Sequence, residues 1–96
     1  MDWTLVYFKT SDGEIPVRSY LSGRSLSDSE RVRLGESIAF LAEHGIEANN
    51  KLPDRFRRLT GRRYRDLCEI RLRSTHNPRV FYSFAEDRQI VLLEGV

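Results

Sequence analysis

The sequence predicts an α+β domain in which two helices pack on one face of a four-stranded antiparallel sheet. Three observations predict this fold. Residues 64–73 alternate between apolar and polar side chains, which is typical of a strand, and two further strand-like runs follow at 79–84 and 89–93. Together the three runs predict a C-terminal three-stranded meander. Two helical segments precede the meander, and an N-terminal strand opens the chain. Because both helices are expected on one face, the other face of the sheet stays open.

The first strand is predicted at residues 3–8, which are mostly aromatic or β-branched. Apolar residues on both of its faces favour a covered position in the sheet. A short helix is predicted next. Pro16 suits its first turn, since the N–H that proline lacks would have no partner there, and Gly23 is typical of a helix end.

A longer helix is predicted to begin at a capping box, in which the side chains of Ser27 and Glu30 each bond the other residue's backbone N–H. Apolar residues at helical spacing indicate the face that packs on the sheet: Leu34, Ile38 and Leu41. Gly45 can adopt the left-handed conformation that ends many helices. His44, in the last turn, favours the negative end of the helix dipole, and we interpret it as a helix-end residue rather than a catalytic one.

The region between this helix and the meander is predicted to be irregular. Residues 47–52 show no periodicity and indicate a loop. We expect Asp54–Leu59 to be a loop or one irregular turn, anchored by Phe56, ahead of a break at Gly61.

The meander begins with the run from Tyr64 to Arg73. A period of two divides this run between two faces, with Cys68, Ile70 and Leu72 on one and Leu67, Glu69, Arg71 and Arg73 on the other. Ser74–Pro78 has the composition of a turn, and the polar break at Glu86–Arg88 predicts a second hairpin turn. The meander therefore has one apolar face and one arginine-bearing face.

Length and composition indicate a single domain over residues 1–96, with 40% hydrophobic and 31% charged residues, as is ordinary for a soluble globular protein. No apolar run reaches the ~18 residues of a membrane span and no signal peptide opens the chain, so we expect a cytoplasmic protein without membrane contact. Cys68, the single cysteine, is interpreted as an inert buried thiol rather than a nucleophile. Two histidines and one cysteine, none at ligand spacing, do not predict a metal site, and no cofactor is implied.

The formal net charge of +2 conceals a separation of charge along the chain. Residues 1–54 hold six Lys and Arg against nine Asp and Glu, whereas residues 55–79 hold nine Arg against two acidic residues. The planar guanidinium of arginine suits phosphate oxygens. This basic block predicts a site for a polyanion or for an acidic protein partner, and the alternative is a solvated charged surface that keeps the protein soluble.

Three segments in order along the chain carry a family resemblance: Leu67–Arg73, Arg79–Phe84 and Ile90–Val96. With the strand and helices before them, they resemble the RelE/ParE toxin superfamily, and within it the phage-derived HigB-like branch. The resemblance covers nearly the whole chain, and it is strongest from Tyr64 to Gly95. It implies the toxin of a type II toxin–antitoxin pair, with a helix-turn-helix antitoxin as partner.

The resemblance to the RelE and HigB members implies a metal-independent endoribonuclease that cuts messenger RNA in the ribosomal A site. There the 2′-hydroxyl attacks the adjacent phosphate, so the reaction needs a proton acceptor, a proton donor and cations around the phosphate. Matched position by position, the family's basic residues on the open sheet face fall on Glu69, Arg71, Arg73 and Arg79. We expect the three arginines to contact phosphate, with Arg79 stabilising the transition-state charge; the alternative is that they are ordinary solvated strand residues.

Two further residues are candidates for proton transfer. Glu69 occupies a position that is often lysine in the family, and it could be a base or an ion-pair partner of Arg71 and Arg73. His76, in the turn beside Arg79, could carry a proton because its unperturbed pKa lies near neutrality, or it could be a solvated turn residue.

The remaining arginines of the basic block are expected to bind ribosomal RNA broadly or to pair with an acidic antitoxin: Arg55, Arg57, Arg58, Arg62, Arg63 and Arg65. Tyr82 matches a family tyrosine, but its parity with Val80 and Phe84 predicts that it faces the core.

The end of the chain departs from the family pattern. Family members continue past the glycine that matches Gly95 into a short basic or aromatic tail that supplies active-site residues, whereas this chain stops at Val96. We expect either a shortened toxin that binds its antitoxin without cutting RNA, or a member that works without the tail. The alternative function is a ParE-like inhibitor of DNA gyrase or a non-catalytic protein-binding module, although arginines concentrated on one strand face suit RNA better.

Overall fold

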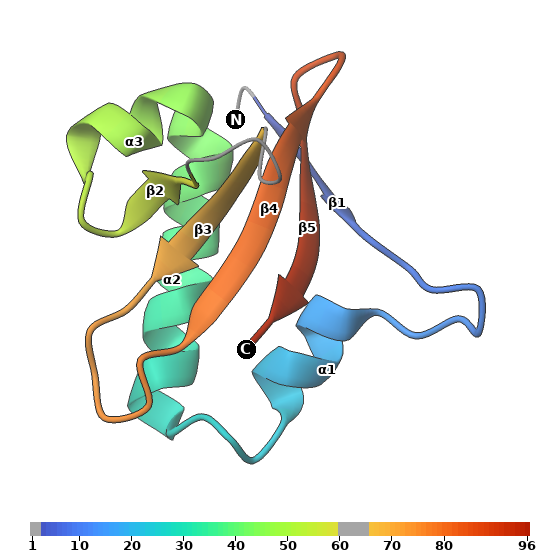
Figure 1. Cartoon of the computed structure of the whole chain (residues 1–96), viewed down its shortest axis with the longest axis vertical. Coiled ribbons are helices and arrows are strands. Elements are labelled where there is room, and N and C mark those ends of the chain that lie inside the picture. The colour runs from blue at the N-terminus through green and yellow to red at the C-terminus, as the bar shows by residue number, and fades with distance from the viewer. Residues whose placement is uncertain (1–2, 60–65) are drawn as a thin grey trace.

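The computed structural model describes residues 3–59 and 66–96, and it confirms the α+β architecture. The elements in chain order are β1 (Thr4–Tyr7), α1 (Pro16–Ser22), α2 (Asp28–His44), a 3-10 turn (Gly45–Glu47), α3 (Ala48–Lys51), β2 (Phe56–Arg58), β3 (Leu67–Arg71), β4 (Arg79–Ala85) and β5 (Gln89–Gly95). Figure 1 shows α2 crossing behind the sheet, so that the opposite face of β3 and β4 is turned towards the viewer.

The sheet has five strands in the order β1-β5-β4-β3-β2, and it differs in two ways from the four-stranded antiparallel sheet expected from the sequence. β1 pairs parallel with β5, with Leu5 opposite Ile90, so the sheet is mixed. The long connection that a parallel pair requires is supplied here by the helices and the meander together. β2 adds a fifth strand, which pairs antiparallel with β3 and sets Arg57 opposite Glu69.

The predictions of a loop at residues 47–52 and of a loop or irregular turn at Asp54–Leu59 were both wrong. Residues 48–51 form the single turn of α3, and residues 56–58 form β2. Phe56 is 1% exposed and stacks on Phe40 of α2, with ring centroids 5.5 Å apart. A strand of three residues is too short to show a period of two, so β2 depends on its partner β3 and on this packing.

The capping box at the start of α2 and the core follow the predicted pattern, whereas Gly45 ends the helix at positive φ without the left-handed helical conformation expected from the sequence. The Ser27 hydroxyl accepts a hydrogen bond from the Glu30 N–H at 3.1 Å, and Glu30 Oε1 accepts one from the Ser27 N–H at 2.9 Å. The apolar stripe of α2 packs against the inner face of the sheet, where the buried residues are Cys68, Ile70, Leu72, Val80, Tyr82, Ile90 and Leu92. Within residues 3–59 and 66–96, no helix has the length and apolar character needed to cross a membrane.

The parity argument for Tyr82 and Cys68 is confirmed, since both are fully buried. The Tyr82 hydroxyl donates a hydrogen bond to Asn49 Oδ1 at 3.2 Å, which ties α3 to β4. Burial raises the pKa of the Cys68 thiol, as expected for an inert cysteine. The predicted second hairpin turn is also confirmed, with Asp87 and Arg88 at positive φ between β4 and β5.

Candidate functional site

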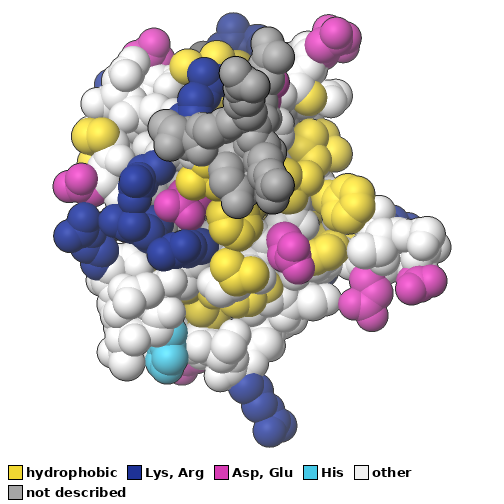
Figure 2. Space-filling model, in the orientation of Figure 1, with side chains coloured by type: hydrophobic (Ala, Val, Ile, Leu, Met, Phe, Trp, Pro, Cys, Tyr) yellow, Lys and Arg dark blue, Asp and Glu magenta, His cyan; other side chains and the backbone are white. Residues whose placement is uncertain are grey.

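The open face of the sheet contains a cleft of about 620 Å³ over β2, β3 and β4, here called the open-face cleft. It is lined by four arginines, one glutamate and three apolar residues: Arg57, Arg58, Arg71 and Arg79; Glu69; Leu59, Leu67 and Phe81. Figure 2 shows Lys and Arg side chains gathered on this face over the β2 and β3 side, next to hydrophobic surface over β4 and β5. The cleft therefore combines cationic, acidic and apolar groups.

Glu69 lies at the floor of the open-face cleft. Cys68 and Ile70, its neighbours in β3, are fully buried in the core, so alternation turns Glu69 away from the helices. It is nevertheless only 3% exposed. Its carboxylate oxygens lie 3.9 Å from Arg57 Nη1 and 4.0 Å from Arg79 Nε. Guanidinium groups from both neighbouring strands therefore balance the charge, as a buried carboxylate requires.

The strand register places two cations directly opposite one another. Arg71 on β3 pairs with Arg79 on β4, and like charges in this arrangement repel. The Glu69 carboxylate lies near Arg79 and offsets part of this repulsion. Arg71 Nε, by contrast, is buried and has no hydrogen-bond partner among the described residues. An anion entering the open-face cleft would give Arg71 a partner and would screen the two cations from each other.

Phe81 supplies an aromatic surface that the sequence interpretation did not single out. It stands opposite Glu69 in the β3–β4 pair and is partly exposed in the open-face cleft. An exposed aromatic ring beside cations is a platform on which a nucleic-acid base can stack. Alternation along β4 could have identified Phe81 from the sequence. A strand that turns Val80 and Tyr82 to the core must turn Phe81 to the open face, and both neighbours are indeed fully buried.

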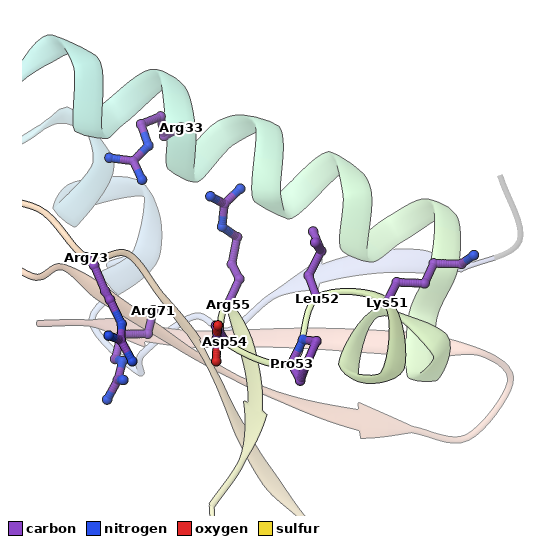
Figure 3. Close-up of a pocket in the computed structure, with 8 residues that line it drawn as sticks. All are labelled: Arg33, Lys51, Leu52, Pro53, Asp54, Arg55, Arg71 and Arg73. Carbon is purple, nitrogen blue, oxygen red and sulfur yellow. The ribbon is translucent and has the colours of Figure 1, made fainter.

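A second pocket of about 360 Å³ lies at the edge of the sheet, between α2 and the residues around the start of β2, and is here called the edge pocket (Figure 3). It is lined by Arg33, Lys51, Leu52, Pro53, Asp54, Arg55, Arg71 and Arg73. Arg71 thus lines both cavities. Arg33, Lys51 and Asp54 were not predicted as site residues. For Arg33 the reason is that no local spacing in the sequence relates a residue of α2 to Arg71 of β3.

His76 lies beside Glu30, and it is not among the residues that line either cavity. His76 Nδ1 is 2.7 Å from Glu30 Oε1, and the His76 backbone N–H donates to Glu30 Oε2 at 3.2 Å. The Ser74 hydroxyl also donates to Glu30 Oε2. The carboxylate that caps α2 therefore holds the β3–β4 loop against the start of that helix.

These hydrogen bonds shift the pKa of Glu30. The N–H of Ser27 is the strongest influence and lowers the pKa of the carboxyl below its usual range, helped by the Ser74 hydroxyl and by His76. Burial opposes this shift, but the donors outweigh it. Glu30 is therefore a charged structural residue.

The structure distributes the other predicted site residues between the two cavities. Glu69, Arg71 and Arg79 come together in the open-face cleft, whereas Arg73 lines the edge pocket. The ion pairs of Glu69 are formed with Arg57 and Arg79, not with Arg71 and Arg73 as the sequence suggested. Of the other arginines of the basic block, Arg57 and Arg58 line the open-face cleft and Arg55 lines the edge pocket. Arg62, Arg63 and Arg65 lie outside the described residues.

The position of Arg79 is fixed by backbone pairing with Val96. The Arg79 N–H donates to the Val96 carbonyl at 3.0 Å, and the Val96 N–H donates back at 2.9 Å. The hydroxyl of Tyr20, on α1, donates to the same Val96 carbonyl at 2.8 Å. The start of β4 is thus tied to the end of the chain and to α1.

Comparison with known proteins gives a match at the level of the family. The model of the family described as "Phage derived protein Gp49-like (DUF891)" matches residues 24–96. This range contains both cavities and all the predicted site residues. Comparison with curated proteins gives no match.

Proposed function

The chain belongs to the phage-derived Gp49-like family, and on that basis we propose that it is a HigB-like toxin that cuts messenger RNA on the ribosome. The family is associated with the toxins of toxin–antitoxin systems. The proposed partners are a helix-turn-helix antitoxin, the ribosome and its messenger. The observation that carries the nuclease proposal is the Glu69 carboxylate, buried between Arg57 and Arg79 in the open-face cleft.

In the proposed reaction, the phosphate to be cut enters the open-face cleft with its oxygens towards Arg57, Arg71 and Arg79. Glu69 accepts the proton of the 2′-hydroxyl, while the 2′-oxygen forms a bond to phosphorus. The bond from phosphorus to the 5′-oxygen breaks, the 5′-oxygen takes a proton from water, and a cyclic phosphate remains. The arginines stabilise the negative charge that develops on the phosphate oxygens.

The distances around Glu69 suit this role. Charge-assisted N–H···O hydrogen bonds are about 2.7–2.9 Å long, whereas the two ion pairs of Glu69 measure 3.9 and 4.0 Å. Arg57 and Arg79 therefore balance the carboxylate charge while their N–H donors stay available for a phosphate. Arg73 and His76 take no part in this proposed step, because neither lines the open-face cleft.

The test uses programmed ribosomes, a short messenger and mapping of the new 5′ ends. Wild-type protein is compared with Arg79→Ala and Glu69→Gln, and Arg24→Ala is the matched control because Arg24 is exposed and lines neither cavity. We expect cuts in A-site codons from wild type and from the control. Arg79→Ala should cut about 10²-fold more slowly, and Glu69→Gln about 10²- to 10⁴-fold more slowly.

Three results would contradict parts of the proposal. If a folded wild-type protein makes no cut and instead inhibits gyrase supercoiling, the ParE-like alternative is correct. If it does neither and still binds its antitoxin, the chain is a non-catalytic binding module. If Glu69→Gln cuts like wild type, Glu69 only balances the charge of its neighbouring arginines. Equal thermal unfolding midpoints would show that the variants remain folded.

A further inference from the structure

We propose that the edge pocket binds a second phosphate of the same RNA strand whose scissile phosphate occupies the open-face cleft, with Arg71 contacting both. This inference rests on the proposed function and extends it, because it assigns to the protein a path for the RNA strand. Both cavities have Arg71 in their walls, and this side chain carries a buried donor that no described residue satisfies.

The charge of the edge pocket is the first support. Its lining contains five cations and one acid: Arg33, Lys51, Arg55, Arg71 and Arg73 with Asp54. None of these cations forms an ion pair with a described residue. Arg31, two residues before Arg33 in α2, is by contrast paired with Asp28. The edge pocket thus gathers positive charge that the described part of the chain leaves unbalanced.

The directions of the side chains are the second support. In Figure 3, Arg33 reaches from α2 towards the pocket, and Arg55 reaches from the loop before β2 towards α2. The two side chains therefore approach from opposite walls, each with a planar set of donors that matches phosphate geometry. Lys51 lies at the far end and points away from the arginines.

The spacing of Arg71 and Arg73 is the third support, and it favours RNA over a single small anion. Arg71 is the last residue of β3 and Arg73 follows two residues later, a separation of about 6–7 Å in extended backbone. That spacing is comparable to the distance between successive phosphates of an extended single strand. A strand held by Arg57, Arg71 and Arg79 in the open-face cleft would therefore deliver its next phosphate to Arg73 and the edge pocket.

The experiment measures binding of two single-stranded RNA probes that carry 2′-O-methyl groups and so lack the attacking hydroxyl. The first is a dinucleotide with one phosphate linkage, and the second is a pentanucleotide with several. Wild type should bind the pentanucleotide more tightly. The Arg33→Gln/Arg55→Gln double variant should lose tenfold or more of its affinity for the pentanucleotide but keep its affinity for the dinucleotide. Arg24→Gln, at an exposed position that lines neither cavity, should change either affinity by less than about threefold.

The inference is overturned if wild type binds both probes equally, or if the double variant binds the pentanucleotide as wild type does. It is also overturned if a poly-glutamate peptide, but not the pentanucleotide, loses affinity in the double variant, because the pocket would then serve an acidic protein. Should the double variant unfold, Arg73→Gln gives the same comparison, since Arg73 is exposed and lines only the edge pocket.

The ribosome cleavage assay separates the two proposals. If wild type cuts RNA and the double variant binds both probes normally, only the edge-pocket inference fails. If wild type does not cut and the double variant still loses affinity for the pentanucleotide alone, the RNA path is supported and the nuclease proposal fails.

Discussion

Glu30 joins two parts of the molecule that are far apart in the sequence. Its place in the capping box was predictable, because that motif lies within four consecutive residues. Its hydrogen bonds to Ser74 and to the backbone of His76, which span 44 and 46 positions, were not. The same long-range contact explains why His76, a candidate proton carrier by sequence, lies with Glu30 and outside the lining of both cavities.

The lowered pKa of Glu30 predicts a pH dependence of stability. A carboxyl with a lower pKa in the folded state stabilises the fold above its unfolded pKa, and this contribution is lost as the pH falls below about 4.5. Glu30→Gln should therefore lower the thermal unfolding midpoint by several degrees at neutral pH, and the gap from wild type should shrink as the solution is acidified below that value. Circular dichroism melting over a pH series measures both midpoints.

Glu36→Gln is the control for this prediction. Glu36 lies on the same helix and is exposed, and no hydrogen bond or ion pair to a described residue involves it. Its substitution should leave the midpoint nearly unchanged at every pH. A gap between wild type and Glu30→Gln that stays constant through acidification would show that the charge of Glu30 contributes nothing to the stability of the loop.

At the level of elements, α2 has one glycine in its middle, Gly35, and is followed directly by another, Gly45, and the two have opposite surroundings. Gly45 ends the helix at φ 56°, a conformation that favours glycine, and the indole of Trp3 occupies the space that a side chain would need. Gly35 lies in the exposed middle of the helix, with nothing within 4 Å of the position that a Cβ would take. The end of α2 is therefore constrained by packing, whereas its middle is not.

These surroundings predict opposite effects for the same substitution. Gly35→Ala should raise the free energy of unfolding by about 0.5–1 kcal/mol, because alanine loses less backbone entropy in a helix. Gly45→Ala should lower it by about 1–3 kcal/mol through backbone strain and displacement of Trp3. Urea unfolding followed by circular dichroism measures both. Equal effects of the two substitutions would mean that neither the positive φ of Gly45 nor its contact with Trp3 persists in solution.

β2 shows what a local pattern misses at the level of an element. Its three residues have no detectable period, and they form a strand because Phe56 packs on Phe40 and the backbone pairs with β3. This strand also brings Arg57 to Glu69. Alternation in β3 therefore predicted which face of the sheet Glu69 occupies. The burial of Glu69, by contrast, depends on Arg57 and Arg79, which only the folded chain brings to it.

At the scale of the whole molecule, the meander was predictable and the sheet order was not. Short turns force β3, β4 and β5 into antiparallel neighbours, so their order follows from the sequence. β1 is separated from its partner β5 by most of the chain, and its alternation carries no information about partner or direction. The same distinction applies to the cavities, since the β3 and β4 arginines were predicted together whereas Arg33 joins them only through the packing of α2.

The buried thiol of Cys68 offers a measurement of how firmly this assembled sheet holds Glu69. Cys68 precedes Glu69 in β3, is fully buried, and has a raised thiol pKa, so both access and reactivity are suppressed in the folded state. β3 lies inside the sheet between β4 and β2, and we expect that exposing Cys68 requires global unfolding.

A thiol reagent should therefore label the native protein at least about 10³-fold more slowly than the urea-unfolded chain. A Cys68→Ala protein that also carries Ser25→Cys, at an exposed position, should label at nearly the unfolded rate. Fast labelling of Cys68 in a protein whose circular dichroism remains native would mean that β3 opens locally, and Glu69 would then not be held between Arg57 and Arg79 as the nuclease proposal requires.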